Sequence, residues 1–328
     1  EQVRQSIADQ LNRAHGSQLS AQNIVMTCGA AGGLNVLFKA LLNPGDEVIV
    51  FAPFFGEYTH YVHNYDGELV VVPTHPDTFL PDLEALKAAV TAHTKAVILN
   101  TPNNPTGVVY PASLLKEMAE ILEQKQAEFG SSIYVVSDEP YREIAYDGVE
   151  VPYILDYFRN GFIGYSYSKS LSLPGERIGY LAANNGMDGL DEILSALNVA
   201  TRILGFVNAP SLFQKVIARV ADLSVDVTPY RENRDLIYNH LISLGFSCTK
   251  PQGAFYLFPK APGGDDKAFC EMAKKYNILV VPGSSFGCPG YFRLSYCVSR
   301  EQILRSMPAF EKLASELSET VPGFKAVK

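Results

Sequence analysis

The sequence predicts an α/β protein in which a large three-layer αβα domain, built around a mostly parallel sheet, is followed by a smaller α+β domain. Two observations support this fold class. Strand-like runs alternate with helical periodicity through the first half, and several runs are continuously apolar, which is typical of parallel strands covered on both faces. After Asn185 the alternation stops, and a long helical region leads into short strands mixed with helices.

This alternation predicts the residue range of each strand and helix in the large domain. Strands are expected at 23–29, 44–53, 67–73, 95–102, 132–140, 161–168 and 178–185, and helices at 30–43, 81–91 and 111–129. A mostly helical region follows from about 189 to about 244, with breaks near 208–210 and 228–229. The last short strands are expected within 253–260, 278–287 and 291–297.

The boundary between the two domains is expected near Leu223, which gives a large domain of residues 17–223 and a small domain of residues 224–328. The chain opens without Met and already inside an amphipathic helix, with apolar residues at Val3, Ile7 and Leu11. We expect residues 1–16 to pack on the small domain. We also expect further N-terminal sequence to precede Glu1.

Composition narrows the classes of function. The 328 residues are 47% apolar, as in an ordinary globular protein, and no apolar run approaches the roughly 20 residues of a membrane span. A cytoplasmic protein is therefore expected, with no membrane partner. A net charge of -8 without any block of basic residues argues against a nucleic-acid partner.

The cysteines carry no metal-binding pattern. They form no C-x-x-C pair and have no histidine at metal-ligand spacing, so no metal is expected. Reduced, mostly buried thiols are expected instead. The cysteines are Cys28, Cys248, Cys270, Cys288 and Cys297.

In an open parallel sheet, ligands bind at the carboxyl ends of the strands, so the residues that follow each strand are the candidates for function. The first strand leads into TCGAAGG, Thr27 to Gly33. Small residues at the start of a helix allow backbone N–H groups to bind an anion, although a plain tight turn without a ligand is sufficient to explain this motif alone. The second strand leads into APFFGEY, where Phe54 or Phe55 is placed either to stack on a flat ring or to pack in the core.

Two further strand ends carry polar side chains. The stretch TPNNPTG, Thr101 to Gly107, is a rigid turn whose two asparagine amides can donate and accept hydrogen bonds in fixed directions. The strand IYVVS ends at Asp138, with Tyr141 three residues later. Asp138 suits a carboxylate that pairs with a buried cation, or alternatively a helix N-cap.

The stretch YSYSKSLSLPGERIG places Lys169 at an apolar strand end among hydroxyls and aromatic rings. A lone lysine is usually a solvated surface charge. At this position it would lose hydration, its pKa would fall, and its neutral amine would be able to attack a carbonyl. Arg177, with Ser166 and Ser168, supplies the donors that a phosphate needs. Together the five strand ends suit a phosphorylated aromatic aldehyde that carries a ring nitrogen.

These motifs resemble a known family. NPTG at Asn104–Gly107, D-x-x-Y at Asp138–Tyr141 and S-x-S-K ending at Lys169 and followed by Arg177 occur in the order found in class I/II aminotransferases of fold type I, the aspartate aminotransferase superfamily. The resemblance covers essentially the whole chain. It implies a dependence on pyridoxal 5′-phosphate.

The resemblance also implies a role for each candidate residue. Lys169 would form the internal Schiff base and then move the proton between the substrate Cα and C4′ of the cofactor. Asp138 would pair with the protonated ring nitrogen, so that the ring accepts electrons after deprotonation. Tyr141 and Asn104 would hydrogen-bond the cofactor's ring hydroxyl, and Phe55 would stack on the ring face. The phosphate would be held by Ser166, Arg177, the backbone of Ala30 and Ala31, and Ser168.

Arg293 lies in the apolar stretch YFRLSYC, where an unpaired guanidinium is costly to bury. A structural ion pair is one explanation. By resemblance, Arg293 would instead clamp the substrate α-carboxylate, with Asn104 assisting. Members of the family carry an N-terminal segment over the site and form dimers with active sites at the subunit interface, so a homodimer is expected.

The expected activity is amino transfer between an L-amino acid and a 2-oxo acid. The alternative on the same scaffold is a β-elimination lyase acting on a sulfur amino acid, or a decarboxylase, because the cofactor contacts are shared. A non-catalytic regulatory domain is a third alternative. The apolar stretch 201–210 lines either a substrate pocket or the core.

Overall fold

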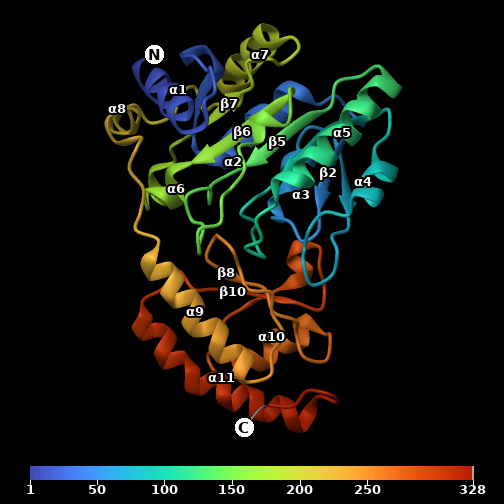
Figure 1. Ribbon diagram of the computed structural model, residues 1–328, viewed down its shortest axis with the longest axis vertical. Helices are drawn as coiled ribbons and strands as arrows, with labels where there is room; N and C mark the ends of the chain where they lie inside the picture. Colours follow the sequence, from blue (N-terminus) through green and yellow to red (C-terminus); the bar gives the residue numbers. More distant parts are fainter. Residues whose placement is uncertain (327–328) are drawn as a thin grey trace.

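The computed structural model describes residues 1–326 and has the α/β fold that the sequence predicts (Figure 1). A seven-stranded sheet has the order β1-β7-β6-β5-β4-β2-β3. Neighbouring pairs from β3 to β6 are parallel, and only β7 runs antiparallel to its neighbours. The strands are β1 (Ile24–Thr27), β2 (Glu47–Phe51), β3 (Glu68–Val72), β4 (Thr94–Leu99), β5 (Tyr134–Asp138), β6 (Gly161–Ser166) and β7 (Gly179–Ala183).

Every strand predicted for the large sheet is present, within a few residues of its expected limits. The helices around this sheet are α1 (Gln2–His15), α2 (Gly29–Leu41), α3 (Glu57–His63), α4 (Leu83–Ala89), α5 (Ala112–Phe129), α6 (Tyr167–Ser170), α7 (Leu190–Ile203) and α8 (Ser211–Val220). The sequence pattern did not predict α3. Its sequence, EYTHYVH, has seven residues, and its buried face consists only of Tyr58 and Val62, which is too short a pattern to identify a helix.

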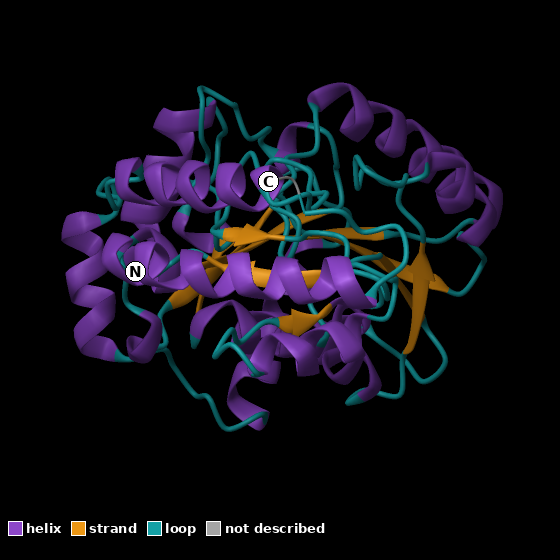
Figure 2. Ribbon diagram, turned by 90° about the horizontal axis from the view of Figure 1, so that it is seen from below, coloured by secondary structure: helices purple, strands orange, loops and turns teal. Residues whose placement is uncertain are grey.

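Alternate residues of the strands point to opposite faces of the sheet, and each face has its own helices (Figure 2). On β2, Val48 and Val50 pack with α2, α3 and α7, whereas Ile49 and Phe51 pack with α4 and α5. This double burial explains why the strands read as continuous apolar runs.

The first helix packs on the large domain and not on the small one, so the sequence prediction for residues 1–16 was wrong. Its apolar stripe of Val3, Ile7 and Leu11 lies against Ile24 and Met26 of β1, and α8 lies beside it. The physical reason is that α4 and α5 leave the β1 end of their face uncovered. Helix α1 fills that gap, close in sequence to the strand it covers.

The C-terminal part contains a three-stranded sheet in the order β8-β10-β9, with helices α9 (Thr228–Ser243), α10 (Asp266–Lys274) and α11 (Arg300–Thr320). The strands are β8 (Tyr256–Leu257), β9 (Val281–Pro282) and β10 (Phe292–Ser295). The boundary proposed near Leu223 falls in the segment between α8 and α9. Three residues from the large sheet's side, Tyr141, Ile144 and Tyr146, are buried in the core of this part.

Two other sequence expectations concern the whole chain. All five cysteines are unpaired, but only Cys270 is buried, and Cys297 is exposed, so the expectation of mostly buried thiols was wrong. Within residues 1–326, no helix combines the length and the apolar character that a membrane crossing requires. The cytoplasmic location stays a prediction.

Candidate active site

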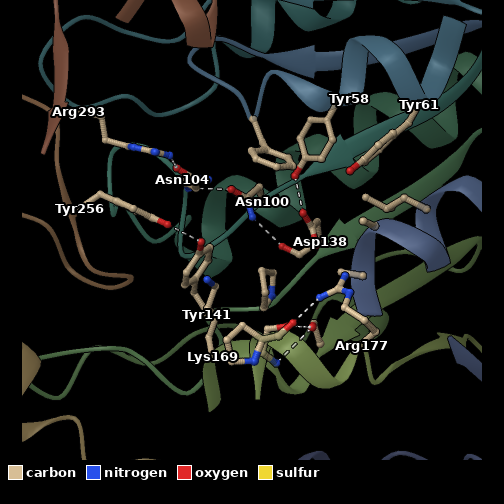
Figure 3. A pocket seen from close by; sticks show the side chains of 18 residues that line it. Tyr58, Tyr61, Asn100, Asn104, Asp138, Tyr141, Lys169, Arg177, Tyr256 and Arg293 are labelled. Carbon is tan, nitrogen blue, oxygen red and sulfur yellow. Dashed lines mark hydrogen bonds between the residues drawn. The ribbon is translucent and has the colours of Figure 1, made fainter. Parts of the chain in front are cut away.

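A cavity of about 330 Å³ lies at the carboxyl ends of β2, β4, β5 and β6, between the large sheet and the C-terminal part of the chain (Figure 3). All of the site residues predicted from the sequence line it, although they come from distant parts of the chain. These residues are Ala30, Ala31, Phe55, Asn104, Asp138, Tyr141, Ser166, Ser168, Lys169, Arg177 and Arg293.

The sheet topology brings one side of the cavity together at Gly179, the first residue of β7. Because β7 is antiparallel to both neighbours, Gly179 pairs with Ser166 at the end of β6 and with Thr27 at the end of β1. The start of α2 therefore lies beside the start of α6. Arg177, two residues before β7, lies between them.

These three segments form a cradle for an anion. The Ser166 and Ser168 hydroxyl oxygens are 2.7 Å apart. Arg177 donates from Nη1 to the carbonyl oxygen of Pro174 at 2.8 Å, which fixes the guanidinium at the cavity wall. Gly29 begins α2 with φ at +74°, and a Cβ there would lie 2.7 Å from Nη2 of Arg177, so only glycine allows this approach. Helix N-terminus, hydroxyls and guanidinium together suit a phosphate.

Asp138 ends β5 at the floor of the cavity and is buried. Tyr58 of α3 donates its hydroxyl hydrogen to Oδ2 at 2.6 Å, whereas Oδ1 is buried without a hydrogen-bond partner among the described residues. Burial raises the pKa of Asp138 to about 6; the bond from Tyr58 opposes this rise and Glu139 adds to it. No helix begins at Asp138, so the N-cap alternative was wrong. The free oxygen can accept a hydrogen bond from a cationic N–H group.

The asparagines and Arg293 form the opposite wall. Asn100 Nδ2 donates to the backbone oxygen of Asp138 at 2.8 Å, and its Oδ1 accepts the backbone N–H of Asn104 at 2.7 Å. Arg293 donates from Nη1 to Oδ1 of Asn104 at 2.9 Å. Among residues 1–326, Arg293 forms no ion pair, so the structural ion pair considered for it is not found. Its charge is available to an anionic ligand.

Two aromatic side chains support Arg293. Its guanidinium carbon lies 4.5 Å from the centre of the Tyr256 ring and 4.7 Å from that of Phe286. The hydroxyl of Tyr256 in turn lies 2.9 Å from the hydroxyl of Tyr141. These contacts fix the position of the guanidinium, a group that can bind a carboxylate in a bidentate pair.

Lys169 lies in the short helix α6 with its Nζ 5.3 Å from the centre of the Phe255 ring. Burial lowers the pKa of the Lys169 ammonium, and the nearby positive charges of Arg293 and Arg177 lower it as well, whereas Cys297 opposes these effects. A lowered pKa increases the fraction of neutral amine, which is the nucleophilic form.

The structure also separates alternatives that the sequence left open. Phe55 lines the cavity, whereas Phe54 is buried against Gly287. The stretch 201–210 does not line the cavity; it covers the end of α7 and the turn that follows, and both Ile203 and Val207 are exposed there. The pocket-lining role considered for this stretch was therefore wrong.

Sequence reasoning missed four polar residues of the cavity: Tyr58, Tyr61, Asn100 and Tyr256. Tyr58 and Tyr61 lie one turn apart on the unpredicted helix α3. Asn100 directly follows β4, so the rule about strand ends was sufficient to find it. Tyr256 lies within the apolar run GAFYLF, where a tyrosine gives no sign of a polar role.

Comparison with known proteins agrees with this geometry. A family model described as aminotransferase class I and II matches residues 1–309. Among curated proteins, the aspartate aminotransferase of Thermotoga maritima is 33% identical over 94% of this chain and 80% of that protein. A probable aspartate/prephenate aminotransferase of Thermus aquaticus is 31% identical over the same shares of the two chains.

Solved structures show the same relationship. An aminotransferase from Eubacterium rectale has a TM-score of 0.94 and 47% identity, and the match covers 96% of this chain and 80% of that one. The aromatic aminotransferase of Pyrococcus horikoshii has a TM-score of 0.87 and 29% identity over 96% of this chain and 85% of that one. The chain belongs to the class I and II aminotransferases, a pyridoxal-phosphate-dependent family of enzymes, and is itself an aminotransferase.

Proposed function

We propose that this chain binds pyridoxal 5′-phosphate in the cavity described above and transfers an amino group between an L-amino acid and a 2-oxo acid. The observation that carries the proposal is the buried, unpartnered Oδ1 of Asp138, in one cavity with the amine of Lys169. An isolated carboxylate is costly to bury, and a ring nitrogen that carries a proton is the partner it lacks.

The residues present fit the rest of the cofactor. The cradle of Ser166, Ser168, Arg177 and the start of α2 suits its phosphate. Phe55 lies on the cavity wall with its ring free to stack on a flat ligand, and its own ring packs edge-on against Tyr58 at 5.6 Å. Tyr141 and Asn104 are the groups that would hydrogen-bond the ring hydroxyl. When bound, the cofactor supplies an electron-accepting ring conjugated to the substrate Cα.

Each remaining step belongs to residues of this chain. Arg293 and Asn104 bind and orient the substrate carboxylate, because the guanidinium has no competing acidic partner within residues 1–326. Lys169 would hold the cofactor through its side-chain amine, and when that amine is free, Nζ would accept the substrate Cα proton and donate it to C4′ of the cofactor. Its lowered pKa supports both roles, since attack and proton removal need the neutral amine.

The cofactor and its attachment can be tested together by mass spectrometry. Reducing the loaded protein with borohydride makes the attachment permanent, and we expect the added mass on a peptide that contains Lys169. The Lys169→Ala variant should lose that mass and at least 1,000-fold of its turnover, since nucleophile and proton carrier are lost together. Added mass at another lysine, or normal turnover by this variant, would contradict the proposal.

The names of the relatives suggest which substrates to test first. Relatives are named for aspartate, for aspartate or prephenate, and for aromatic substrates. We propose aspartate as the first donor to test with 2-oxoglutarate, followed by aromatic amino acids. A product amino acid that forms only when an oxo acid is added indicates transfer. Pyruvate and ammonia from a cystathionine-type substrate would instead indicate the lyase, and loss of carbon dioxide the decarboxylase.

We also propose a homodimer. Large apolar side chains are exposed on α7, on α8 and next to them. The loop between these helices packs on α2, because the Phe206 ring lies 3.8 Å from the position of a Cβ on Gly32. A second copy on this surface would cover the exposed apolar side chains. The exposed residues are Val199, Ile203, Val207, Leu212, Val216 and Leu223.

A further inference from the structure

Tyr256 contacts both Tyr141, proposed above to bind the cofactor, and Arg293, proposed above to bind the substrate carboxylate. Tyr256 places its hydroxyl 2.9 Å from that of Tyr141, and its ring carries the guanidinium of Arg293 at 4.5 Å. Figure 3 shows Tyr256 between these two residues at the cavity wall. Tyr256 and Arg293 lie on neighbouring antiparallel strands, β8 and β10, so their relative placement follows from the small sheet.

The contact with Tyr141 is well shielded from water. Tyr141 is 4% exposed and Tyr256 is 8% exposed. The two rings also pack edge to face, with centres 5.8 Å apart. A hydrogen bond between two buried hydroxyls has few competing partners, so its geometry persists.

Only one of the two hydroxyls donates to the other. Burial raises the pKa of both tyrosines, so both hydroxyls keep their hydrogen. The 2.9 Å contact allows either hydroxyl to donate, and the Arg293 guanidinium at 4.5 Å from the Tyr256 ring favours Tyr256 as the donor, because a nearby cation makes a phenol hydroxyl more acidic. With Tyr256 as donor, Tyr141 accepts one bond and keeps its own hydrogen free to point into the cavity.

We propose that Tyr256 is a positioning residue whose hydroxyl aims the Tyr141 hydrogen at the cofactor while its ring holds Arg293 against the substrate carboxylate. The proposal rests on the function proposed above and adds a residue that acts through two others. The hydroxyl and the ring have separate effects. The hydroxyl strengthens donation by Tyr141, since a hydroxyl that accepts a hydrogen bond becomes a stronger donor. The ring supports the guanidinium through a cation–π contact.

The hydroxyl effect is tested by a double-mutant cycle read from the absorbance of the bound cofactor. A hydrogen bond from Tyr141 to the ring hydroxyl keeps the pKa of the imine at Lys169 low, so weaker donation raises the pH midpoint of the absorbance change. Tyr256→Phe should raise that midpoint by roughly half a unit. In a Tyr141→Phe background the same substitution should leave the midpoint unchanged, because the residue through which Tyr256 acts is gone.

The ring effect is tested by binding of a simple monocarboxylate, 3-phenylpropionate, to the loaded protein. Tyr256→Phe keeps the ring beneath Arg293 and should bind this probe as the unmodified protein does. Tyr256→Leu removes the ring and should weaken binding about threefold or more. Tyr230→Phe is the matched control. It removes a hydroxyl from a tyrosine that packs on Phe255 outside the cavity lining, and it should leave both readouts unchanged.

Each outcome either supports or overturns the proposal. An unchanged midpoint in Tyr256→Phe, or an equal shift with and without Tyr141, overturns the hydroxyl part. Equal affinity of the Phe and Leu variants for 3-phenylpropionate overturns the ring part. If Tyr256→Leu does not fold, the Tyr256→Phe cycle still decides the hydroxyl part. Failure of the proposed function looks different, because the unmodified protein would then take up no cofactor absorbance at all.

Discussion

Tyr58 donates its hydroxyl hydrogen to Oδ2 of Asp138 at 2.6 Å and leaves Oδ1 of the same carboxylate buried without a partner among the described residues. One carboxylate oxygen is thus held by the protein, while the other is buried without a hydrogen bond. Tyr58 fixes the orientation of the carboxylate, and it stabilises the charged form that a cationic ring nitrogen requires.

Removing the Tyr58 hydroxyl should move the pH dependence of cofactor binding. Burial raises the pKa of Asp138 to about 6, so cofactor affinity should fall as the pH falls through this value and the carboxylate gains a proton. Because the Tyr58 bond lowers this pKa, Tyr58→Phe should shift the fall to higher pH by about one unit, the size expected for a hydrogen bond to a charged group. Fluorescence titration with pyridoxal 5′-phosphate at several pH values measures the midpoint.

Tyr65→Phe is the control for this experiment. Tyr65 lies just beyond α3, and its hydroxyl bonds to Asn35 and not to Asp138. The pH dependence of cofactor affinity in Tyr65→Phe should match that of the unmodified protein. A Tyr58→Phe profile with the same midpoint would show that the bond does not set the charge of Asp138.

Replacing Arg293 with lysine should impair substrate binding more than cofactor binding. Lysine cannot form the bidentate pair with a carboxylate, and it loses the stacked position over Tyr256 and Phe286. We expect KM for the amino donor to rise roughly 30-fold or more, which corresponds to about 2 kcal/mol. Steady-state kinetics give this value, and Arg305→Lys, at a 77% exposed side chain paired with Glu301, should change neither KM nor kcat. A normal KM in Arg293→Lys would assign the carboxylate to another group.

Adding a single methyl group at Gly29 should weaken the phosphate cradle. The new Cβ would lie 2.7 Å from Nη2 of Arg177, so the guanidinium has to move away from its place at the start of α2. We expect about a tenfold loss of affinity for pyridoxal 5′-phosphate and a smaller loss for pyridoxal, which has no phosphate, as one charge-assisted contact is disturbed.

The control for this substitution is Gly16→Ala. Gly16 also has a positive φ, +69°, but no atom lies within 4 Å of its Cβ position. Both variants should lose a similar stability, about 1 kcal/mol, because alanine is strained at positive φ. Only Gly29→Ala should lose cofactor affinity; an equal loss of affinity in both would trace the effect to backbone strain and not to Arg177.

An aspartate introduced at Ile203 or Leu212 should turn a dimer into a monomer. These side chains are 64% and 66% exposed, and a charge buried at an apolar interface without a partner costs several kcal/mol. Light scattering after gel filtration should report twice the chain mass for the unmodified protein and a single chain mass for these variants. Leu279→Asp, at an 80% exposed leucine of the small domain, should stay dimeric. A monomeric unmodified protein would contradict the proposed homodimer.

The parts of the site that the sequence predicted are those that follow long apolar strands. Asp138 and Ser166 each end such a run, and parallel strands bring their carboxyl ends to one edge. Tyr58 could not be found in this way, because it lies on a short helix and not at the end of a strand. Tyr256 was hidden because a tyrosine in an apolar strand usually marks a packed core. The packing of α1 was mistaken for a related reason: periodicity identifies the apolar face of a helix, not the surface that the face will cover.

The burial of Tyr141, Ile144 and Tyr146 in the core of the C-terminal part has a consequence for dissecting this protein. Residues 224–328 expressed alone would lack three of their own core side chains, and Gly253 would lose its bridge to Ala145. Such a fragment would have a solvent-exposed apolar cavity at the place where Tyr141, Ile144 and Tyr146 normally pack. The segment that carries Tyr141 therefore also joins the two halves of the chain, and proteolytic cleavage within 139–146 should disrupt the fold and the activity together.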